Sequence, residues 1–186
     1  MNYKLATLED IEATLTLHAK YQVGTIKEED KKDGFVTTAF SKEELTELIQ
    51  KEQGLFIAKE GDEVLAYVMA ASWEFWSKWA MFEHMIKDLP NLEYKGERLS
   101  EKNSYQYGPI CIDKRYRGTS MLRDIFEFSR THMAKRYPIL VTFVNKTNPR
   151  SFHAHNRKLG LEVIQEFKYN NNQYYEMVYD TSKPLT

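Results

Sequence analysis

The stretch of sequence that decides the fold reads Ile110-Cys111-Ile112-Asp113-Lys114-Arg115-Tyr116-Arg117-Gly118-Thr119-Ser120-Met121-Leu122. An apolar run of strand type ends at Asp113, a polar turn follows, and apolar residues recur at helical spacing from Met121 onward. A compact apolar run from Ile139 to Val144 comes next and is typical of a buried strand. The sequence therefore predicts one βαβ unit over residues 104–144.

Regular patterns on both sides extend this unit into a mixed α/β chain. Ser41 followed by Glu44 is a capping box that opens a helix, and two apolar runs around Gly61-Asp62 predict a β-hairpin. The remaining predicted elements are strands at 3–7, 161–169 and 173–179, helices at 8–21, 73–87 and 151–159, and polar loops at 24–34 and 88–103.

Composition excludes several classes of protein. The 186 residues carry 26 Lys+Arg against 27 Asp+Glu, so no general attraction for nucleic acid is expected. No apolar run approaches the roughly 18 residues of a membrane span, and the first residues lack the apolar region of a signal peptide. The single cysteine, Cys111, excludes an intramolecular disulfide and fits a reducing, cytoplasmic location.

The turn between strand and helix is the first candidate for chemistry. The first turn of such a helix leaves backbone N–H groups unpaired at the positive end of the helix dipole, where a pyrophosphate binds well. Gly118 would let the backbone approach a ligand, and Arg115 and Arg117 would add charge-assisted hydrogen bonds. A plain strand-to-helix turn with solvated arginines fits the same spacing equally well.

Two separated motifs resemble one known family. The stretch from Ile112 to Leu122 resembles the acetyl-CoA signature of the GCN5-related N-acetyltransferases, or GNAT family. Downstream, Asn145-Lys146-Thr147-Asn148-Pro149-Arg150-Ser151 and Lys158-Leu159-Gly160-Leu161-Glu162-Val163 look like the family's strand, turn and helix-closing segment. The resemblance implies a single domain over residues 1–186, with a mixed, mostly antiparallel sheet, a bulge and splay at its fourth strand, and helices on both faces. The helical aromatic segment at 73–102 has no counterpart in the family.

The resemblance also implies acetyl-CoA as co-substrate and names the residues that would bind it. Ser120 and Leu122 stand where the family usually has glycine or alanine, and Asn148 matches the position that often bonds the pantetheine arm. The implied coenzyme-binding residues are Ile110, Cys111, Ile112, Arg115, Arg117, Gly118, Thr119, Ser120, Met121, Leu122, Asn148 and Ser151.

Four residues are candidates for catalysis. Asn156 occupies the position where the family often has a tyrosine that protonates the departing thiolate, and its neighbour His155 would substitute because imidazole titrates near pH 6.5. Gln106 falls near the position where some members carry a base glutamate. Glutamine is no base, so Gln106 or Tyr107 is expected to hold a water instead.

Three further features have competing interpretations. Trp73, Glu74 and Trp76 would line the pocket of the amine acceptor, but the same aromatic stripe suits a helix packed on the sheet or a homodimer interface. The spacing of His153 and His155 is poor for metal binding, so no metal is expected. Cys111, in the middle of a strand, is expected to be a small buried residue and no nucleophile.

The expected function is direct transfer of an acetyl group from acetyl-CoA to a primary amine of a small molecule or a peptide. The amine must be neutral to attack, so a base or a water chain is required. A GNAT-fold module that binds CoA without transferring the acetyl group is the alternative, favoured by Asn156 and by the missing glycines of the turn.

Overall fold

The computed structural model describes residues 1–186. Strands are β1 (Asn2–Leu5), β2 (Leu55–Glu60), β3 (Glu63–Ala71), β4 (Glu93–Tyr94), β5 (Glu97–Arg98), β6 (Ser104–Ile112), β7 (Ile139–Asn145), β8 (Glu162–Tyr169) and β9 (Asn172–Asp180). Helices are α1 (Ile11–Tyr21), α2 (Lys42–Glu47), α3 (Trp73–Trp76), α4 (Ala80–Asp88), α5 (Met121–Met133) and α6 (Pro149–His153). Single-turn helices are η1 (Leu8–Asp10), η2 (Glu28–Asp33), η3 (Leu48–Glu52), η4 (Leu89–Asn91), η5 (Lys114–Tyr116) and η6 (Ala154–Lys158).

The sheet confirms the predicted mixed, mostly antiparallel arrangement. Seven strands follow the order β1-β2-β3-β6-β7-β9-β8, and β4 and β5 form a separate two-stranded sheet. The pair β6 and β7 is parallel and is joined through α5, which confirms the βαβ unit. None of the helices is long and apolar enough to span a membrane.

The chain divides into two compact units, which are described one at a time. Unit 1 comprises Met1–Ala70 and Gly108–Ser129, and unit 2 comprises Ala71–Tyr107 and Arg130–Thr186. The chain passes from unit 2 into unit 1 within β6 and returns to unit 2 within α5.

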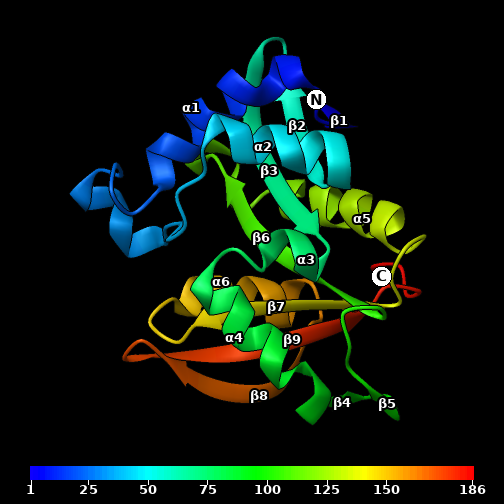
Figure 1. Ribbon diagram of the computed structural model, residues 1–186. Coiled ribbons are helices and arrows are strands. Elements are labelled where there is room, and N and C mark those ends of the chain that lie inside the picture. The colour runs from blue at the N-terminus through cyan, green and yellow to red at the C-terminus, as the bar shows by residue number, and fades with distance from the viewer. The chain divides into compact units, whose positions relative to one another are not determined.

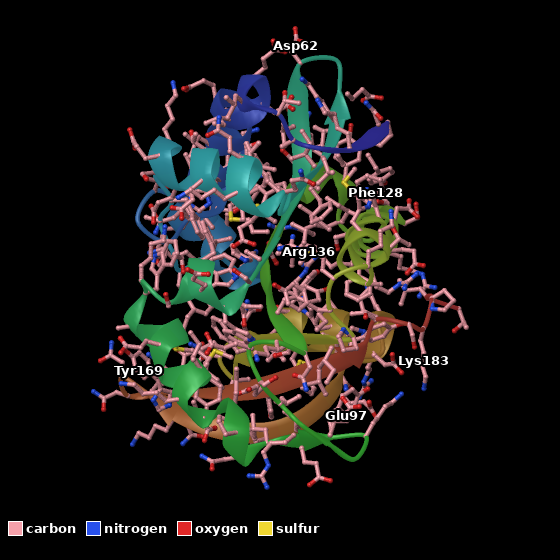
Figure 2. All side chains as sticks on the ribbon, turned by 45° about the vertical axis from the view of Figure 1, so that its right-hand side comes forward. Asp62, Glu97, Phe128, Arg136, Tyr169 and Lys183 are labelled. Atoms are coloured by element: carbon pink, nitrogen blue, oxygen red, sulfur yellow. The ribbon has the colours of Figure 1, made fainter.

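In unit 1, helices cover both faces of an antiparallel sheet. Figures 1 and 2 show α1 and α2 on one side of β2 and β3 and the first part of α5 on the other. On the α5 side, the ring of Phe56 on β2 lies 6.0 Å from that of Phe128. The Ser41 hydroxyl accepts a hydrogen bond from the Glu44 N–H at 3.1 Å, which confirms the capping box at the start of α2. Asp62 stands at the exposed tip of the predicted β2–β3 hairpin (Figure 2).

In unit 2, β7, β9 and β8 form an antiparallel sheet with α4 on one face and α6 on the other (Figure 1). Phe82 of α4 contacts Phe143 of β7 edge to face at 5.7 Å between ring centroids. On the opposite face, the Phe152 ring lies 4.5 Å from that of Tyr175. Tyr175 pairs with Val144, the residue after Phe143, so successive residues of β7 face opposite sides of the sheet.

The aromatic segment differs from its prediction, because it forms two helices, α3 and α4, where one was expected over residues 73–87. The Ser77 hydroxyl donates to the Glu74 carbonyl at 2.6 Å and so competes with the helical backbone bonds. Trp79 then takes an extended conformation, with φ −93° and ψ 130°, and ends the run. Trp73, Phe75 and Trp76 are buried, which favours the interpretation of the stripe as helices packed on the sheet, while Trp79 is half-buried.

Two segments predicted as irregular loops contain short elements. Residues 24–34 include η2, where Lys31 and Glu28 form an ion pair at 2.6 Å across one turn. Residues 88–103 include the β4–β5 hairpin, whose turn carries Lys95 and Gly96 with positive φ. Both elements are polar and short, so neither leaves an apolar periodicity in the sequence.

Candidate functional site

The strand–turn–helix segment of unit 1 places an open stretch of backbone just before the N-terminus of a helix. Gly118 has φ +82°, and a Cβ atom built on it would meet no other atom within 4 Å. The Met121 N–H donates a long hydrogen bond to the Thr119 hydroxyl oxygen at 3.3 Å, and α5 begins there. The backbone before the 13-residue helix α5 is therefore open at the position where a ligand's phosphate would approach the helix N-terminus.

The two arginines of the turn have different partners. Arg115 Nε lies 2.9 Å from Asp113 Oδ1, and its terminal nitrogen contacts Glu63 as well, so two carboxylates balance its charge. Burial alone would raise the pKa of Asp113, but the hydrogen bonds from the Arg115 side chain and backbone lower it to about 2.

Arg117, by contrast, bonds mainly to uncharged oxygens. Its Nε donates to the Ile112 carbonyl at 3.1 Å and a terminal nitrogen donates to the Asp33 carbonyl at 3.3 Å. The guanidinium also lies 4.7 Å from the centre of the Tyr21 ring. Its positive charge therefore stays available to an anion at the turn.

The strand before the turn changes its pairing along its length. The ladder between β6 and β7 runs only from Ser104 opposite Ile139 to Gln106 opposite Val141, while β6 continues to Ile112. This agrees with the splay expected at the fourth strand in the order of the chain's main sheet.

Cys111 is a free, buried thiol on this strand, only 4% exposed. Burial raises its pKa to about 12, and the nearby Arg117 charge and a hydrogen bond from Tyr67 offset this only in part. The thiol is therefore neutral near pH 7. The structure confirms the prediction of a small buried residue.

A cleft of about 550 Å³ opens beside the turn, within unit 1. It is lined by Thr16, Ala19, Lys20, Tyr21, Thr25, Lys27, Asp30, Asp113, Lys114 and Arg115. Lys20 pairs with Asp113 at 3.4 Å, and Lys114 pairs with Asp30 at 3.2 Å. The positive charge of the cleft is therefore partly balanced. No local pattern in the sequence predicts this cleft, because its walls come from α1, the loop that follows α1 and the turn after β6.

Unit 2 brings together several other predicted residues. Asn148 Oδ1 accepts from the Ser151 N–H at 3.1 Å and caps α6. His155 is 5% exposed, and its Nδ1 lies 2.8 Å from the Ser151 carbonyl oxygen and 3.3 Å from the Ser151 hydroxyl. The rings of His155 and Tyr107 meet edge to face at 5.8 Å.

The hydrogen bond to the Ser151 carbonyl fixes the tautomer of His155. A carbonyl oxygen only accepts, so Nδ1 is assigned the proton and Nε2 the lone pair. Burial lowers the pKa of His155, so the ring is neutral near pH 7. The geometry therefore presents a proton acceptor at Nε2.

Asn156 has a structural bond. Its Nδ2 donates to the Leu161 carbonyl at 2.9 Å and joins the end of η6 to the segment before β8. This bond explains why an amide suits the position where the resemblance places a phenol.

Gln106 lies under the aromatic segment of unit 2. Its Nε2 donates to the Tyr107 carbonyl at 2.7 Å, while its buried Oε1 has no partner. Trp76 Nε1 donates to the Gln106 carbonyl at 3.2 Å, and Trp73 Nε1 donates to the Ser104 hydroxyl at 2.9 Å. Glu74 is exposed and is not part of this group.

Sequence reasoning missed two buried polar groups. Glu176 on β9 is 1% exposed, and burial raises its pKa to about 7. His18 on α1 is 5% exposed and bonds through Nδ1 to the Tyr67 hydroxyl at 2.7 Å. The available signal was the pattern itself, because each residue occupies an apolar position of its helix or strand. Across the chain, no cluster of three histidine, cysteine or acidic side chains is close enough to hold a metal ion.

Comparison with known proteins places this geometry in a known fold. No family model and no curated protein matches the chain. An N-acetyltransferase from Staphylococcus aureus Mu50 matches with a TM-score of 0.61 and 15% identity, over 97% of this chain and 98% of that one. Ribosomal-protein-alanine N-acetyltransferase from Brucella melitensis gives 0.62 at 13% identity, over 97% and 99%. The protein yncA from Salmonella typhimurium, solved with its cofactor acetyl-CoA, gives a TM-score of 0.63 at 10% identity, over 98% of this chain and 96% of that one. This chain therefore has the fold of the GCN5-related N-acetyltransferases.

Proposed function

We propose that the chain is an N-acetyltransferase that moves an acetyl group from acetyl-CoA to a primary amine. The single observation that carries the proposal is the open backbone at Gly118, between a splayed strand and the N-terminus of α5. The yncA structure, which holds acetyl-CoA on the same fold, supports the choice of coenzyme. The proposal takes both units as parts of one transferase domain.

In this proposal the backbone does most of the coenzyme binding. N–H groups at the start of α5 bind the pyrophosphate, with Gly118 giving close approach and Arg117 adding positive charge. Backbone groups of Ile110–Ile112 pair with the pantetheine arm in the manner of an added strand, and an amide there polarises the thioester carbonyl. The Asn148 side chain adds a polar contact to the same arm.

Residues of unit 2 carry out part of the proton transfer in this proposal. His155, neutral and with its lone pair on Nε2, relays a proton to the departing thiolate. The buried Gln106 Oε1 has no protein partner, which suits an oxygen that accepts from a bound water. Tyr107 packs against His155 and limits the orientation of its ring.

The acceptor is proposed to be an amine of a small molecule or a peptide. Trp73 and Trp76 contribute to its pocket indirectly, by packing against Ser104 and Gln106, whereas Glu74 is free to meet a cationic amine from solution. A cytoplasmic location is proposed because the one thiol is buried and unpaired.

Isothermal titration with acetyl-CoA, followed by a thiol-release assay over a panel of primary amines, tests the proposal. Gly118→Glu should weaken acetyl-CoA binding at least tenfold, because the side chain fills the space left for the phosphates. Gly61→Glu is the matched control: Gly61 also has positive φ, +58°, and open space around its Cβ position, but it lies in the β2–β3 hairpin. Wild-type protein that binds no acetyl-CoA would rule the proposal out.

A CoA-binding module without transfer is the second candidate function. The bond from Asn156 to the Leu161 carbonyl favours it, because this side chain serves the fold and supplies no acid. The same experiment separates the two functions. Tight binding of acetyl-CoA with no thiol release on any amine would favour the module.

A further inference from the structure

Three buried side chains form a hydrogen-bonded chain in unit 1. His18 comes from α1, Tyr67 from β3 and Cys111 from β6, and they are 5%, 0% and 4% exposed. His18 Nδ1 lies 2.7 Å from the Tyr67 hydroxyl, which also bonds to the Cys111 thiol. These hydrogen bonds thus connect α1 to the segment of β6 that the proposed function assigns to coenzyme binding.

The other ring nitrogen of His18 is the open end of this chain. His18 Nε2 is buried and has no hydrogen-bond partner. A buried polar atom left unpaired is unfavourable, so Nε2 calls for a water or a ligand as its partner. The ring of Phe40 packs edge to face with the imidazole, with 5.5 Å between the ring centroids.

The hydroxyl of Tyr67 decides which nitrogen of His18 holds the proton. A hydroxyl has one proton to donate, and the neutral Cys111 thiol can either donate or accept, so two arrangements of the hydrogen-bonded chain exist. The proposal takes the arrangement in which the hydroxyl donates to sulfur. The bond between Tyr67 and His18 is then donated by Nδ1–H, and Nε2 is assigned the lone pair. Tyr67 and the thiol behind it are the titratable groups facing the ring, and Arg117, Asp113 and Lys20 act on that thiol.

We propose that His18 Nε2 accepts a proton from the amine substrate, with Tyr67 holding the ring in position from the coenzyme-binding strand. The inference rests on the proposed transferase function and adds to it a base on α1. His18 lies far upstream of both sequence motifs, so neither motif points to it as a base.

The protons and bonds of the reaction balance with this assignment. An ammonium R–NH₃⁺ gives one proton to His18 Nε2, which passes it to solvent. The neutral nitrogen then attacks the thioester carbonyl carbon, so a C–N bond forms and the C–S bond breaks. The second proton that the nitrogen loses ends on the departing sulfur. The products are the acetylated amine, the free thiol of CoA and one proton.

Nε2 is buried, so a substrate amine reaches it only when the side chains around it move. Phe40, whose ring contacts the imidazole, belongs to the segment between η2 and α2, which forms no helix or strand beyond an isolated bridge from Val36 to Gln22. Segments without regular backbone pairing open at a low free-energy cost, so the proposal has the amine enter at this segment.

Steady-state thiol release with acetyl-CoA and benzylamine or alaninamide, measured from pH 5 to 9, tests the role of His18. In wild-type protein, kcat should fall on the acid side with a midpoint below about 6.5, because burial lowers the pKa of His18. His18→Gln keeps a donor for Tyr67 but takes up no proton. It should lose this acid limb and about 100-fold or more in kcat, with acetyl-CoA affinity within about twofold of wild type by titration.

Two further variants complete the test. Tyr67→Phe keeps both rings and removes the bond to Nδ1, so it should shift the acid limb and lower kcat about tenfold. His84→Gln, which removes an exposed imidazole from α4, should change neither. The proposal is wrong if His18→Gln keeps the wild-type kcat and acid limb. It is also wrong if His18→Gln fails to fold and Tyr67→Phe has the wild-type pH profile. Failure of the transferase proposal is distinct, because wild-type protein would then bind no acetyl-CoA or release no thiol.

Discussion

Arg115 and Asp113 form a closed pair at the end of β6, with Arg115 Nε 2.9 Å and a terminal nitrogen 3.1 Å from the two carboxylate oxygens. The Asp113 carboxylate also accepts from the Arg115 backbone N–H at 3.0 Å. This pair shapes the entry to the turn, so the two arginines of the motif have different tasks. Arg115 holds the strand end, and Arg117 carries the charge that is free for a ligand.

Arg117→Ala should therefore weaken acetyl-CoA binding more than Arg115→Ala. We expect about a tenfold loss for the first and less than threefold for the second, because only Arg117 has no carboxylate partner in its described contacts. Titration at two salt concentrations checks this, since the electrostatic part of binding weakens as salt rises. Arg117→Lys, which keeps the charge, should recover part of the affinity; equal losses for both alanine variants would contradict the assignment.

Asp113→Asn should destabilise the protein at neutral pH. The pKa of Asp113 in the folded protein, about 2, lies below its unfolded value near 3.9. Its contribution to stability is therefore complete above about pH 4 and is lost as pH falls through 2. We expect roughly 1–2 kcal/mol less unfolding free energy at pH 7 and a smaller difference at pH 3, measured by urea denaturation. Asp62→Asn, at the exposed hairpin tip, is the control (Figure 2).

Two glycines of unit 1 should respond differently to alanine. A Cβ atom on Gly54 would lie 1.9 Å from the Ala70 carbonyl oxygen. The Ala70 N–H donates to the Gly54 carbonyl at 2.8 Å, which holds the two backbones together. Gly54→Ala should therefore cost about 3 kcal/mol or more of unfolding free energy. Gly118→Ala meets open space and pays only for its positive φ, about 1–2 kcal/mol. Comparable losses in thermal denaturation would show that Gly54 is less confined than it is in this structure.

Most of the fold follows from local signals in the sequence. Ser41 and Glu44 cap a helix with bonds that span three residues, and the β2–β3 hairpin turns at Gly61 with positive φ. Such contacts are encoded within one window of sequence, so a pattern predicts them well. The break at Ser77 is local too, but it depends on a side-chain hydroxyl that competes with the backbone, which hydrophobic periodicity does not register.

The sequence predicts one part of the candidate site and not the other, because the two parts depend on contacts of different range. The turn around Gly118 was found because its contacts are continuous in sequence. His18, Tyr67 and Cys111 meet only through tertiary packing, across 49 residues for the first pair. In the sequence, each of the three occupies a position of an apolar face. Only the three-dimensional structure shows that Nε2 of His18 is buried without a partner.

His155→Gln should lower kcat while leaving acetyl-CoA affinity within about twofold of wild type. The neutral ring presents Nε2 as a proton carrier, and general acid–base groups contribute about 100-fold or more. His153→Gln is the matched variant, because His153 is exposed on the same helix and points elsewhere. Thiol-release assays with both variants decide between the two histidines. A larger effect at His153 would move the proton carrier to the surface.

Glu176 should make stability depend on pH in the opposite sense to Asp113. Its carboxyl is buried in unit 2, where Gln165 Nε2 bonds to one oxygen at 3.1 Å and the other oxygen has no partner. Burial raises the pKa to about 7, above the unfolded value near 4.3, and the nearby Asp88 adds to this, while Gln165 offsets part of it. A neutral Glu176 suits the folded protein, so stability is complete below about pH 4 and falls as pH rises through 7.

Glu176→Gln removes this loss, because the amide keeps the shape of the side chain and carries no charge at any pH. We expect the variant to match wild type near pH 4 and to exceed it at pH 8.5 by up to roughly 3 kcal/mol of unfolding free energy. Urea denaturation at the two pH values measures the difference. Glu166→Gln on neighbouring β8, exposed and paired with Lys146 at 2.6 Å, should stay within about 0.5 kcal/mol at both. If Glu176→Gln were less stable than wild type at pH 8.5, the carboxylate would have a cationic partner in solution that this structure does not contain.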